Sequence, residues 1–223
     1  MRRLPAGVHI VFTDRTDGDL AVPADGPPSP ALEARRRAVV EHPWSWLRQV
    51  HGGRAVLVRH PGDRAGDEAD ALVTSVAGAP LAVQVADCAP VALVSAEGVI
   101  GAVHGGWRGL ASGVVASALD LMHAAGAGDV SAVIGPCFRS ECYEFGAADL
   151  DAVAARLGDG VRGRTTGGRP ALDVPAAVRA ALHAAGVTRV EDTEVCTACS
   201  AEHWSHRRSR DAERQALVVW RDG

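Results

Sequence analysis

Three side chains that can bind a metal ion stand at the ends of apolar, strand-like stretches of the 223-residue chain. They are His51 in "QVHGG", Cys88 in "VADCAP" and His104 in "AVHGGW". Side chains at the ends of packed strands can converge on one point, and two imidazoles with one thiolate are a suitable ligand set for zinc. Such a set leaves a fourth coordination position open for water, and the glycines after each histidine leave room for a substrate.

A purely structural interpretation of the same residues stays open. A lone histidine at a strand end is usually a hydrogen-bonded core or rim residue, and a cysteine in an apolar run is usually packing. The three residues are far apart in the sequence and form no compact motif such as His-Glu-x-x-His. Asp87, next to Cys88 in an apolar run, needs a partner and could orient a metal ligand, act as an acid or base, or cap a turn.

Arginines that could bind phosphate accompany these residues. The segment from His104 to Gly109 predicts a strand, a glycine turn and a helix start, where free backbone N–H groups and the guanidinium of Arg108 favour an anion. Arg207 in "WSHRRSRDAERQ" and Arg48 in "WLRQVH" are further candidates. A surface turn and a solvated charge run are the structural alternatives. The Gly-Lys-Ser/Thr ending of a nucleotide-binding P-loop is missing.

Cysteine usage and charge narrow the class of protein. The five cysteines are an odd number scattered over a long chain, which argues against a disulfide framework. "CTAC" at residues 196–199 is interpreted as structural, because no second cysteine pair completes a Cys-rich site. The net charge of −4 favours neither nucleic acid nor an anionic membrane as a partner. Proline and glycine interrupt the basic start "MRRLPAGVHIVF", so we expect no signal peptide and a cytoplasmic protein.

Apolar runs and helical patterns predict one mixed α/β domain over residues 1–223, with a layered β core and outer helices. The most apolar part, residues 71–104, lacks clean alternation, so we expect its strands to be buried on both faces. Helices are predicted over 31–41, 109–128, 147–158 and 173–187, the last with Asp173 as its N-cap. Further strands are predicted over 8–13, on both sides of 51–53 within 44–60, and over 130–138, 187–196 and 215–220.

Five separated motifs together resemble the polyphenol oxidase/laccase-domain family, also described as zinc-dependent purine nucleoside phosphorylases and as peptidoglycan editing factors. The motifs are "LRQVHGGRAVLV", "EADALVTSVAGAPLAVQVADCAPVALV", "GAVHGGWRGL", "IGPCFRSECYEFG" and "CTACSAEHWSHRRSRDAERQ". The resemblance covers roughly residues 44 to 220. It implies an α/β/β/α fold shared with the catalytic domain of necrotizing-factor toxins, and zinc held by His51, Cys88 and His104. It also implies phosphorolysis of adenosine, inosine, guanosine and methylthioadenosine, with adenosine deamination as a second activity.

The sequence departs from the family pattern in three places. "GDLAVPADGPPSP" replaces an Asn-Leu…His-Val-Gly-Asp-Asp motif, "SHRRSRDAERQ" lacks the usual loop glycines, and "VADC" replaces "TADC". The three ligand positions are intact. The departures therefore concern substrate contacts rather than the core chemistry.

Two activities are expected from such a site. Phosphorolysis requires a positioned phosphate, which suits Arg48, Arg108 and Arg207. Deamination requires water activated by zinc. The catalytic candidates are Cys88, His104 and Asp87.

Three other functions stay open. Cys88 as nucleophile with His104 as base would make a cysteine hydrolase or amidase, acting for example on peptidoglycan precursors. Copper-dependent phenol oxidation is less favoured, because multicopper sites use many histidines and the chain has no His-x-His pair. A non-enzymatic module that holds zinc structurally would need a fourth protein ligand, such as Cys137, Cys142 or Cys196.

Overall fold

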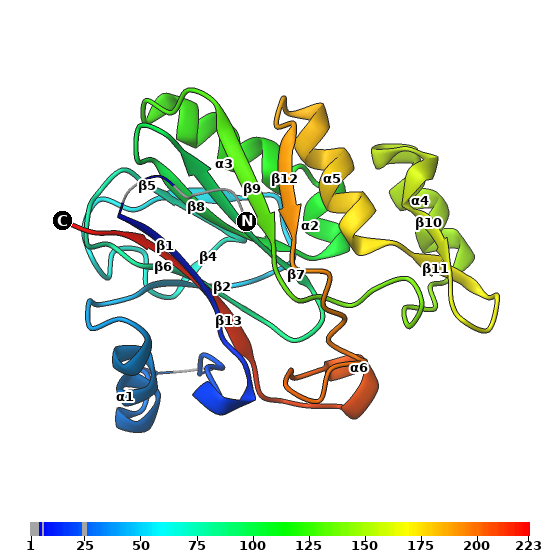
Figure 1. Cartoon of the computed structure of the whole chain (residues 1–223), viewed down its shortest axis with the longest axis horizontal. Helices are drawn as coiled ribbons and strands as arrows, with labels where there is room; N and C mark the ends of the chain where they lie inside the picture. The colour runs from blue at the N-terminus through cyan, green and yellow to red at the C-terminus, as the bar shows by residue number, and fades with distance from the viewer. Residues whose placement is uncertain (1–4, 6, 24–25) are drawn as a thin grey trace.

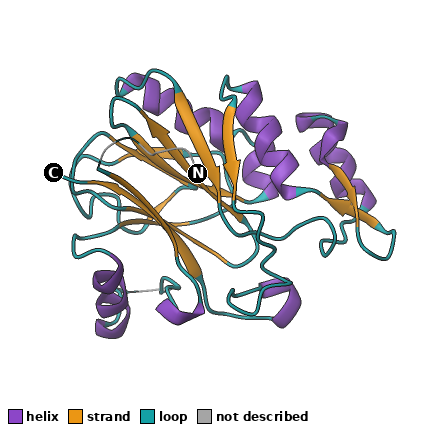
Figure 2. Ribbon diagram, in the orientation of Figure 1, coloured by secondary structure: helices purple, strands orange, loops and turns teal. Residues whose placement is uncertain are grey.

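In the computed structural model of the chain, two β-sheets pack face to face between layers of helices (Figure 2). The structure describes residues 5, 7–23 and 26–223. Within the basic N-terminal start that bears on the signal-peptide expectation, residues 1–4 and 6 lie outside the described residues. The mixed α/β fold expected from the sequence is confirmed.

The larger sheet has six strands in the order β12-β9-β7-β8-β5-β3. Its central pairs are antiparallel, whereas β12–β9 and β3–β5 at the two edges are parallel. Its strands are β3 (Ala55–Leu57), β5 (Ala71–Thr74), β7 (Ala89–Ser95), β8 (Ile100–Gly105), β9 (Val130–Ile134) and β12 (Arg189–Asp192).

The smaller sheet has five strands in the order β1-β13-β6-β2-β4 and is also mixed. The first two pairs are antiparallel, and β6–β2 and β2–β4 are parallel. Its strands are β1 (Val8–Phe12), β2 (Ser45–Arg48), β4 (Asp67–Glu68), β6 (Leu81–Val85) and β13 (Gln215–Arg221). A separate antiparallel hairpin, not expected from the sequence, is formed by β10 (Arg162–Arg164) and β11 (Pro170–Leu172).

Helices lie on the outer side of each sheet (Figure 1). Those over the six-stranded sheet are α2 (Trp107–Ala111), α3 (Val114–Ala124), α4 (Ala147–Leu157) and α5 (Val174–Ala184). On the opposite side of the molecule lies α1 (Pro30–Val39). Three short elements complete the fold: η1 (Arg15–Asp17), η2 (Asp159–Val161) and α6 (His206–Ser209).

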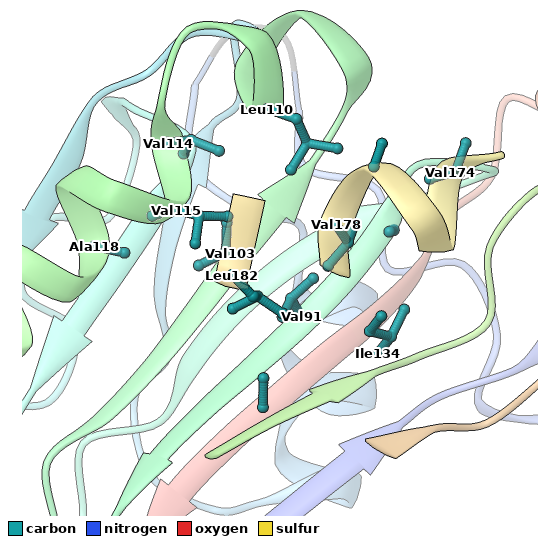
Figure 3. Close-up of a cluster of buried hydrophobic side chains, with 14 of the residues drawn as sticks. Val91, Val103, Leu110, Val114, Val115, Ala118, Ile134, Val174, Val178 and Leu182 are labelled. Carbon is teal, nitrogen blue, oxygen red and sulfur yellow. The ribbon is translucent and has the colours of Figure 1, made fainter. Parts of the chain in front are cut away.

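Side chains of alternating strand positions fill three separate apolar layers. Along β7, Val91 and Leu93 pack under the helices, while Ala92 and Val94 pack between the sheets. The layer under the helices is shown in Figure 3, where Leu110 and Val178 approach the sheet. Because both faces of these strands are covered, the sequence shows no polar alternation there, as expected.

Local sequence signals explain the helix boundaries. The side chain of Ser29 caps α1 ahead of Pro30, and that of Asp173 caps α5 by accepting from the backbone N–H of Ala176 at 2.9 Å, as predicted. The single helix predicted over 109–128 is wrong. Gly113, with φ of 85°, takes the left-handed conformation and divides it into α2 and α3.

Candidate metal centre

Two of the three predicted ligands lie on connections that run from one sheet to the other. His51 lies on the connection from β2 in the smaller sheet to β3 in the larger one, and Cys88 lies on the connection from β6 to β7. His104 stands at the end of β8, where it is paired with Pro90 of β7. Because the sheets are stacked, residues at these crossings meet at one edge of the sandwich.

Asp70 determines how His104 is oriented. The Nδ1 atom of His104 lies 2.7 Å from Oδ1 of Asp70, and both side chains are buried. A carboxylate accepts hydrogen bonds, so His104 donates through Nδ1–H, and Nε2 is the ring atom that would bind a metal ion. The same carboxylate accepts from the backbone N–H groups of His51 at 2.9 Å and Gly52 at 2.7 Å. One buried acid therefore fixes two of the three ligands.

Sequence reasoning missed Asp70, which the segment "PGDRAGDEAD" placed in a charged loop. The available signal was an acidic residue directly before the fully buried strand β5. Burial alone would raise the pKa of this carboxyl, but hydrogen bonds from His104 and the amides of Gly52 and His51 outweigh it and lower the pKa. Asp70 is thus held in the ionised form that a histidine donor requires.

His51 and Cys88 complete the group. His51 has a φ of 57°, a left-handed conformation that aims its ring at the site. Its Nε2 atom lies 3.8 Å from the Cys88 sulfur, and its ring meets that of His104 edge to face, with centroids 4.7 Å apart. One ligand atom from each of the three residues lies within 4.8 Å of the others.

The charge state of this group suits a metal ligand set. Burial would raise the pKa of Cys88, but the neighbouring His104 and His51 lower it to about 6. Burial would lower the pKa of His104, but the Cys88 sulfur and Asp70 raise it to about 9. In the metal-free protein a thiolate therefore lies beside a protonated imidazole, and a bound dication would take the place of the proton on His104 Nε2.

The dimensions of the site also fit zinc. Tetrahedral coordination with Zn–N of about 2.0 Å and Zn–S of about 2.3 Å separates nitrogen from sulfur by about 3.5 Å, close to the 3.8 Å observed between His51 Nε2 and the Cys88 sulfur. A Cβ on Gly106 would lie 2.7 Å from Cδ2 of His51 and 3.5 Å from the Cys88 sulfur. The glycine predicted to give access therefore leaves the face of the ligand group clear.

Asp87 is tied to the C-terminal part of the chain. It has a φ of 100°, and its buried carboxylate accepts from Thr197 Oγ1 at 2.8 Å, Ser205 Oγ at 2.6 Å and the backbone N–H of Arg207 at 2.7 Å. These bonds connect the residue before Cys88 to the start of α6. The strained backbone and three donors favour a positioning role.

A cavity of about 740 Å³ opens in front of the ligands. Every predicted site residue lines it, namely Arg48, His51, Asp87, Cys88, His104, Arg108 and Arg207. The guanidinium of Arg108 stacks 4.2 Å from the Trp107 ring. The guanidinium of Arg207 lies 4.5 Å from the ring of Tyr143. Sequence reasoning missed the lining residues Tyr143 and Arg214; the quoted motif "CYEFG" contained the only signal for Tyr143.

The fourth-ligand alternative finds no support among the described residues. Cys142 and Cys196 form a group with Cys199 instead, and Cys137 does not belong to the group around His104.

The model of the family described as multi-copper polyphenol oxidoreductase laccase matches residues 30–222 of the chain. The chain belongs to this family.

Relatives in the family carry a more specific name. The chain is 37% identical to purine nucleoside phosphorylase ORF3 of Streptomyces griseus, covering 96% of this chain and 94% of the relative. It is 38% identical to a purine nucleoside phosphorylase of Streptomyces coelicolor, with 97% and 96% covered. The crystal structure of YlmD from Geobacillus stearothermophilus superposes with a TM-score of 0.84 at 28% identity, covering 98% of this chain and 93% of that one. The likeness to the toxin fold stays a prediction.

The family match agrees with the order of the five motifs and with the fold of the described residues. In the part of the chain that the structure describes, no helix has both the length and the apolar character to cross a bilayer.

Proposed function

We propose that the protein is a zinc-dependent purine nucleoside phosphorylase that acts on adenosine, inosine, guanosine and methylthioadenosine, with adenosine deamination as a second activity. The observation that carries the proposal is the placement of two imidazoles and a thiolate at one end of a cavity that three arginines also line. The names of the Streptomyces relatives support the purine nucleoside phosphorylase activity.

His51, Cys88 and His104 would hold the metal ion, with Asp70 fixing the two histidines. Zinc bound there would supply a Lewis acid with an open position facing the cavity. The donor set of nitrogen and sulfur favours zinc over the hard cations that prefer oxygen ligands. Copper also accepts imidazole and thiolate, so metal analysis of the isolated protein decides between the two.

The arginines are assigned to the phosphate. In phosphorolysis, a phosphate oxygen forms a bond to C1′ of the ribose while the C1′–N9 bond to the purine breaks. The purine leaves with the bonding electrons and takes up a proton, and ribose 1-phosphate is formed. Arg48, Arg108 and Arg207 line the cavity and can hold the anion in line with C1′.

The aromatic partners of two arginines give these side chains defined positions. Stacking on Trp107 and Tyr143 restricts the guanidinium groups of Arg108 and Arg207 before phosphate arrives. Asp87 holds the backbone of Arg207 and so acts as a positioning residue. Less conformational freedom is then lost when phosphate binds, which strengthens binding.

Chromatography of adenosine incubated with the protein tests the proposal, with and without phosphate and with and without a chelator. Adenine that appears only with phosphate and disappears on chelation is the expected result. Inosine formed without phosphate, and lost on chelation, is the expected sign of the deaminase activity. If neither product forms, the purine assignment is wrong for this chain.

A second function is supported by one specific observation. The pKa of Cys88, lowered to about 6 by His104 and His51 against the effect of burial, is that of a reactive thiol. In a cysteine hydrolase or amidase, Cys88 would attack a carbonyl and His104 would transfer the proton. Chelation would spare such an enzyme and alkylation of Cys88 would stop it, whereas chelation would stop the proposed phosphorylase and zinc bound to Cys88 would protect it from alkylation.

A further inference from the structure

Three cysteines outside the site described above form a second compact group. The sulfur atoms of Cys142, Cys196 and Cys199 all lie within 4.8 Å of one another, and those of Cys142 and Cys199 are 3.3 Å apart. Cys196 and Cys199 come from one Cys-x-x-Cys turn, and Cys142 comes from the loop after β9. This group has no residue in common with the group around His104.

Backbone pairing holds the two segments together. Cys137 and Cys196 form an isolated parallel bridge, in which the N–H of Cys137 donates to Val195 O at 3.2 Å and the N–H of Thr197 donates to Cys137 O at 3.1 Å. Main-chain contacts at Cys137 therefore join the loop that carries Cys142 to the turn. These main-chain hydrogen bonds hold the two segments together without a disulfide.

The turn itself has the geometry of a thiolate ligand loop. The N–H groups of Cys199 and Ser200 both donate to Cys196 O, at 3.1 Å and 3.0 Å. Two cysteines separated by two residues in one turn have the spacing that is typical of zinc ligands.

The spacing of the sulfurs matches a metal site. A tetrahedral zinc ion with Zn–S bonds of about 2.3 Å holds two sulfurs about 3.8 Å apart. The three sulfurs lie within 4.8 Å of one another, with Cys142 and Cys199 at 3.3 Å, so small side-chain shifts bring them to that separation; Cys196 is buried, Cys142 half-buried and Cys199 exposed. A cation can reach the group from solvent, and three soft ligands select a thiophilic one.

We propose that Cys142, Cys196 and Cys199 bind a second zinc ion, distinct from the one assigned to His51, Cys88 and His104. Each thiol gives up its proton as its sulfur binds the metal, and a solvent molecule takes the fourth position.

This second site would stabilise the wall of the cavity. Thr197, inside the Cys-x-x-Cys turn, donates to Asp87 at 2.8 Å. Tyr143, next to Cys142, lies 4.5 Å from the guanidinium of Arg207. A metal ion bound to the three cysteines therefore joins the two loops that position Asp87 and Arg207, without touching the substrate.

Metal analysis of purified protein, stripped by chelator under reducing conditions and reloaded with zinc, tests the proposal. The wild type is expected to hold two equivalents of zinc. Cys199→Ser and Cys142→Ala are each expected to lose one equivalent, and His104→Ala is expected to lose the other. The double variant Cys199→Ser with His104→Ala is expected to hold none. Cys137→Ala, which removes a buried thiol outside both groups, is expected to keep two.

Cobalt provides a second readout. Thiolate-to-cobalt charge-transfer absorption is expected in His104→Ala from the three-sulfur site, and this absorption is lost when Cys199→Ser is added. Wild-type protein that holds a single equivalent, lost in His104→Ala, would overturn the proposal. Peptide mapping that finds a Cys142–Cys199 disulfide in protein reloaded with zinc would overturn it too. The result for the His104 site is read separately, so failure of one assignment does not affect the other.

Discussion

A single buried carboxylate, that of Asp70, holds two ligand candidates through different kinds of hydrogen bond. It accepts from the imidazole of His104 and from the main chain that carries His51. Removal of its charge therefore changes both the basicity of one ligand and the position of the other. This pairing of a metal-ligating histidine with a carboxylate is a common way to fix ring orientation.

Asp70→Asn is expected to weaken zinc binding about 10- to 100-fold, because the amide is a weaker acceptor for His104. Competition with a chromophoric chelator measures the affinity. Glu68→Gln, an exposed acid two positions earlier, is the matched control and is expected to bind zinc like the wild type. Equal affinities in both variants would show that Asp70 does not support the metal.

The thiol of Cys88 is expected to titrate at an unusually low pH in metal-free protein. Its pKa is lowered to about 6, since His104 and His51 outweigh the opposing effect of burial. The alkylation rate should rise as the pH increases through about 6 and level off above it, because the thiolate is the reacting form. Added zinc should block the reaction.

Iodoacetamide labelling followed by peptide mass spectrometry measures this profile. Cys142 is the internal control, because burial raises its pKa to about 12, so its labelling should stay low near neutral pH. A Cys88 rate that is still rising well above neutral pH would contradict the thiolate–imidazolium arrangement.

Residue-level reasoning selected candidate ligands and arginines that the structure brings to one cavity, but it did not find the residues that support them. His51, Cys88 and His104 were recognisable because metal-binding side chains at the ends of apolar runs are unusual. Asp70 and Tyr143 were not, because their importance depends on contacts with residues distant in sequence, such as the 34 positions between Asp70 and His104. The same limit hid the Cys142 partner of the Cys-x-x-Cys turn, 57 positions from Cys199.

At the level of elements, the site is positioned by the two connections that pass from one sheet to the other, β2 to β3 and β6 to β7. The helices α1, α4 and α5 were predictable because caps and apolar periodicity mark them locally. The division of one apolar run into β6 and β7, which belong to different sheets, was not. The apolar run predicts buried strands, but only the tertiary fold shows that "ADC" at residues 86–88 connects a strand of one sheet to a strand of the other. The break at Gly113 was missed because an isolated glycine is tolerated in many helices.

The crossing between β6 and β7 is secured to α6 by Asp87. Asp87→Asn is expected to raise KM for phosphate about tenfold, a loss of about 1.4 kcal/mol, because the carboxylate no longer holds Arg207 and its neighbours. Steady-state kinetics with varied phosphate and saturating adenosine provide the measurement. A fall in kcat at unchanged KM would instead indicate that Asp87 acts in the chemical step.

At the level of the whole molecule, the apolar layer between the two sheets holds the connections β2–β3 and β6–β7 in place. Its apolar layer includes Leu81, Leu217 and Ile100, contributed by both sheets and fully buried. A mixed β core covered by helices on both sides was predictable from composition and apolar runs. The strand order was not, because pairing between strands distant in sequence leaves no local signal.

Leu81→Ala is expected to lower the free energy of unfolding by about 2–5 kcal/mol, since it opens a cavity between the sheets. The midpoint of urea unfolding should fall while the slope stays the same. Val50→Ala is the control, because Val50 is 50% exposed and should change stability by less than about 0.5 kcal/mol. A similar loss in both variants would contradict the packing described.

Ribose 1-phosphate formation from adenosine and phosphate, compared between two glycine variants, tests the metal-dependent phosphorylase most directly. Gly106→Ala places a methyl carbon 2.7 Å from His51 Cδ2, whereas Gly160→Ala meets no atom within 4 Å. The account predicts that Gly106→Ala loses phosphorolysis and the zinc equivalent assigned to His51, Cys88 and His104, and that Gly160→Ala retains both. Full phosphorolysis by Gly106→Ala, or none by the zinc-loaded wild type, would contradict it.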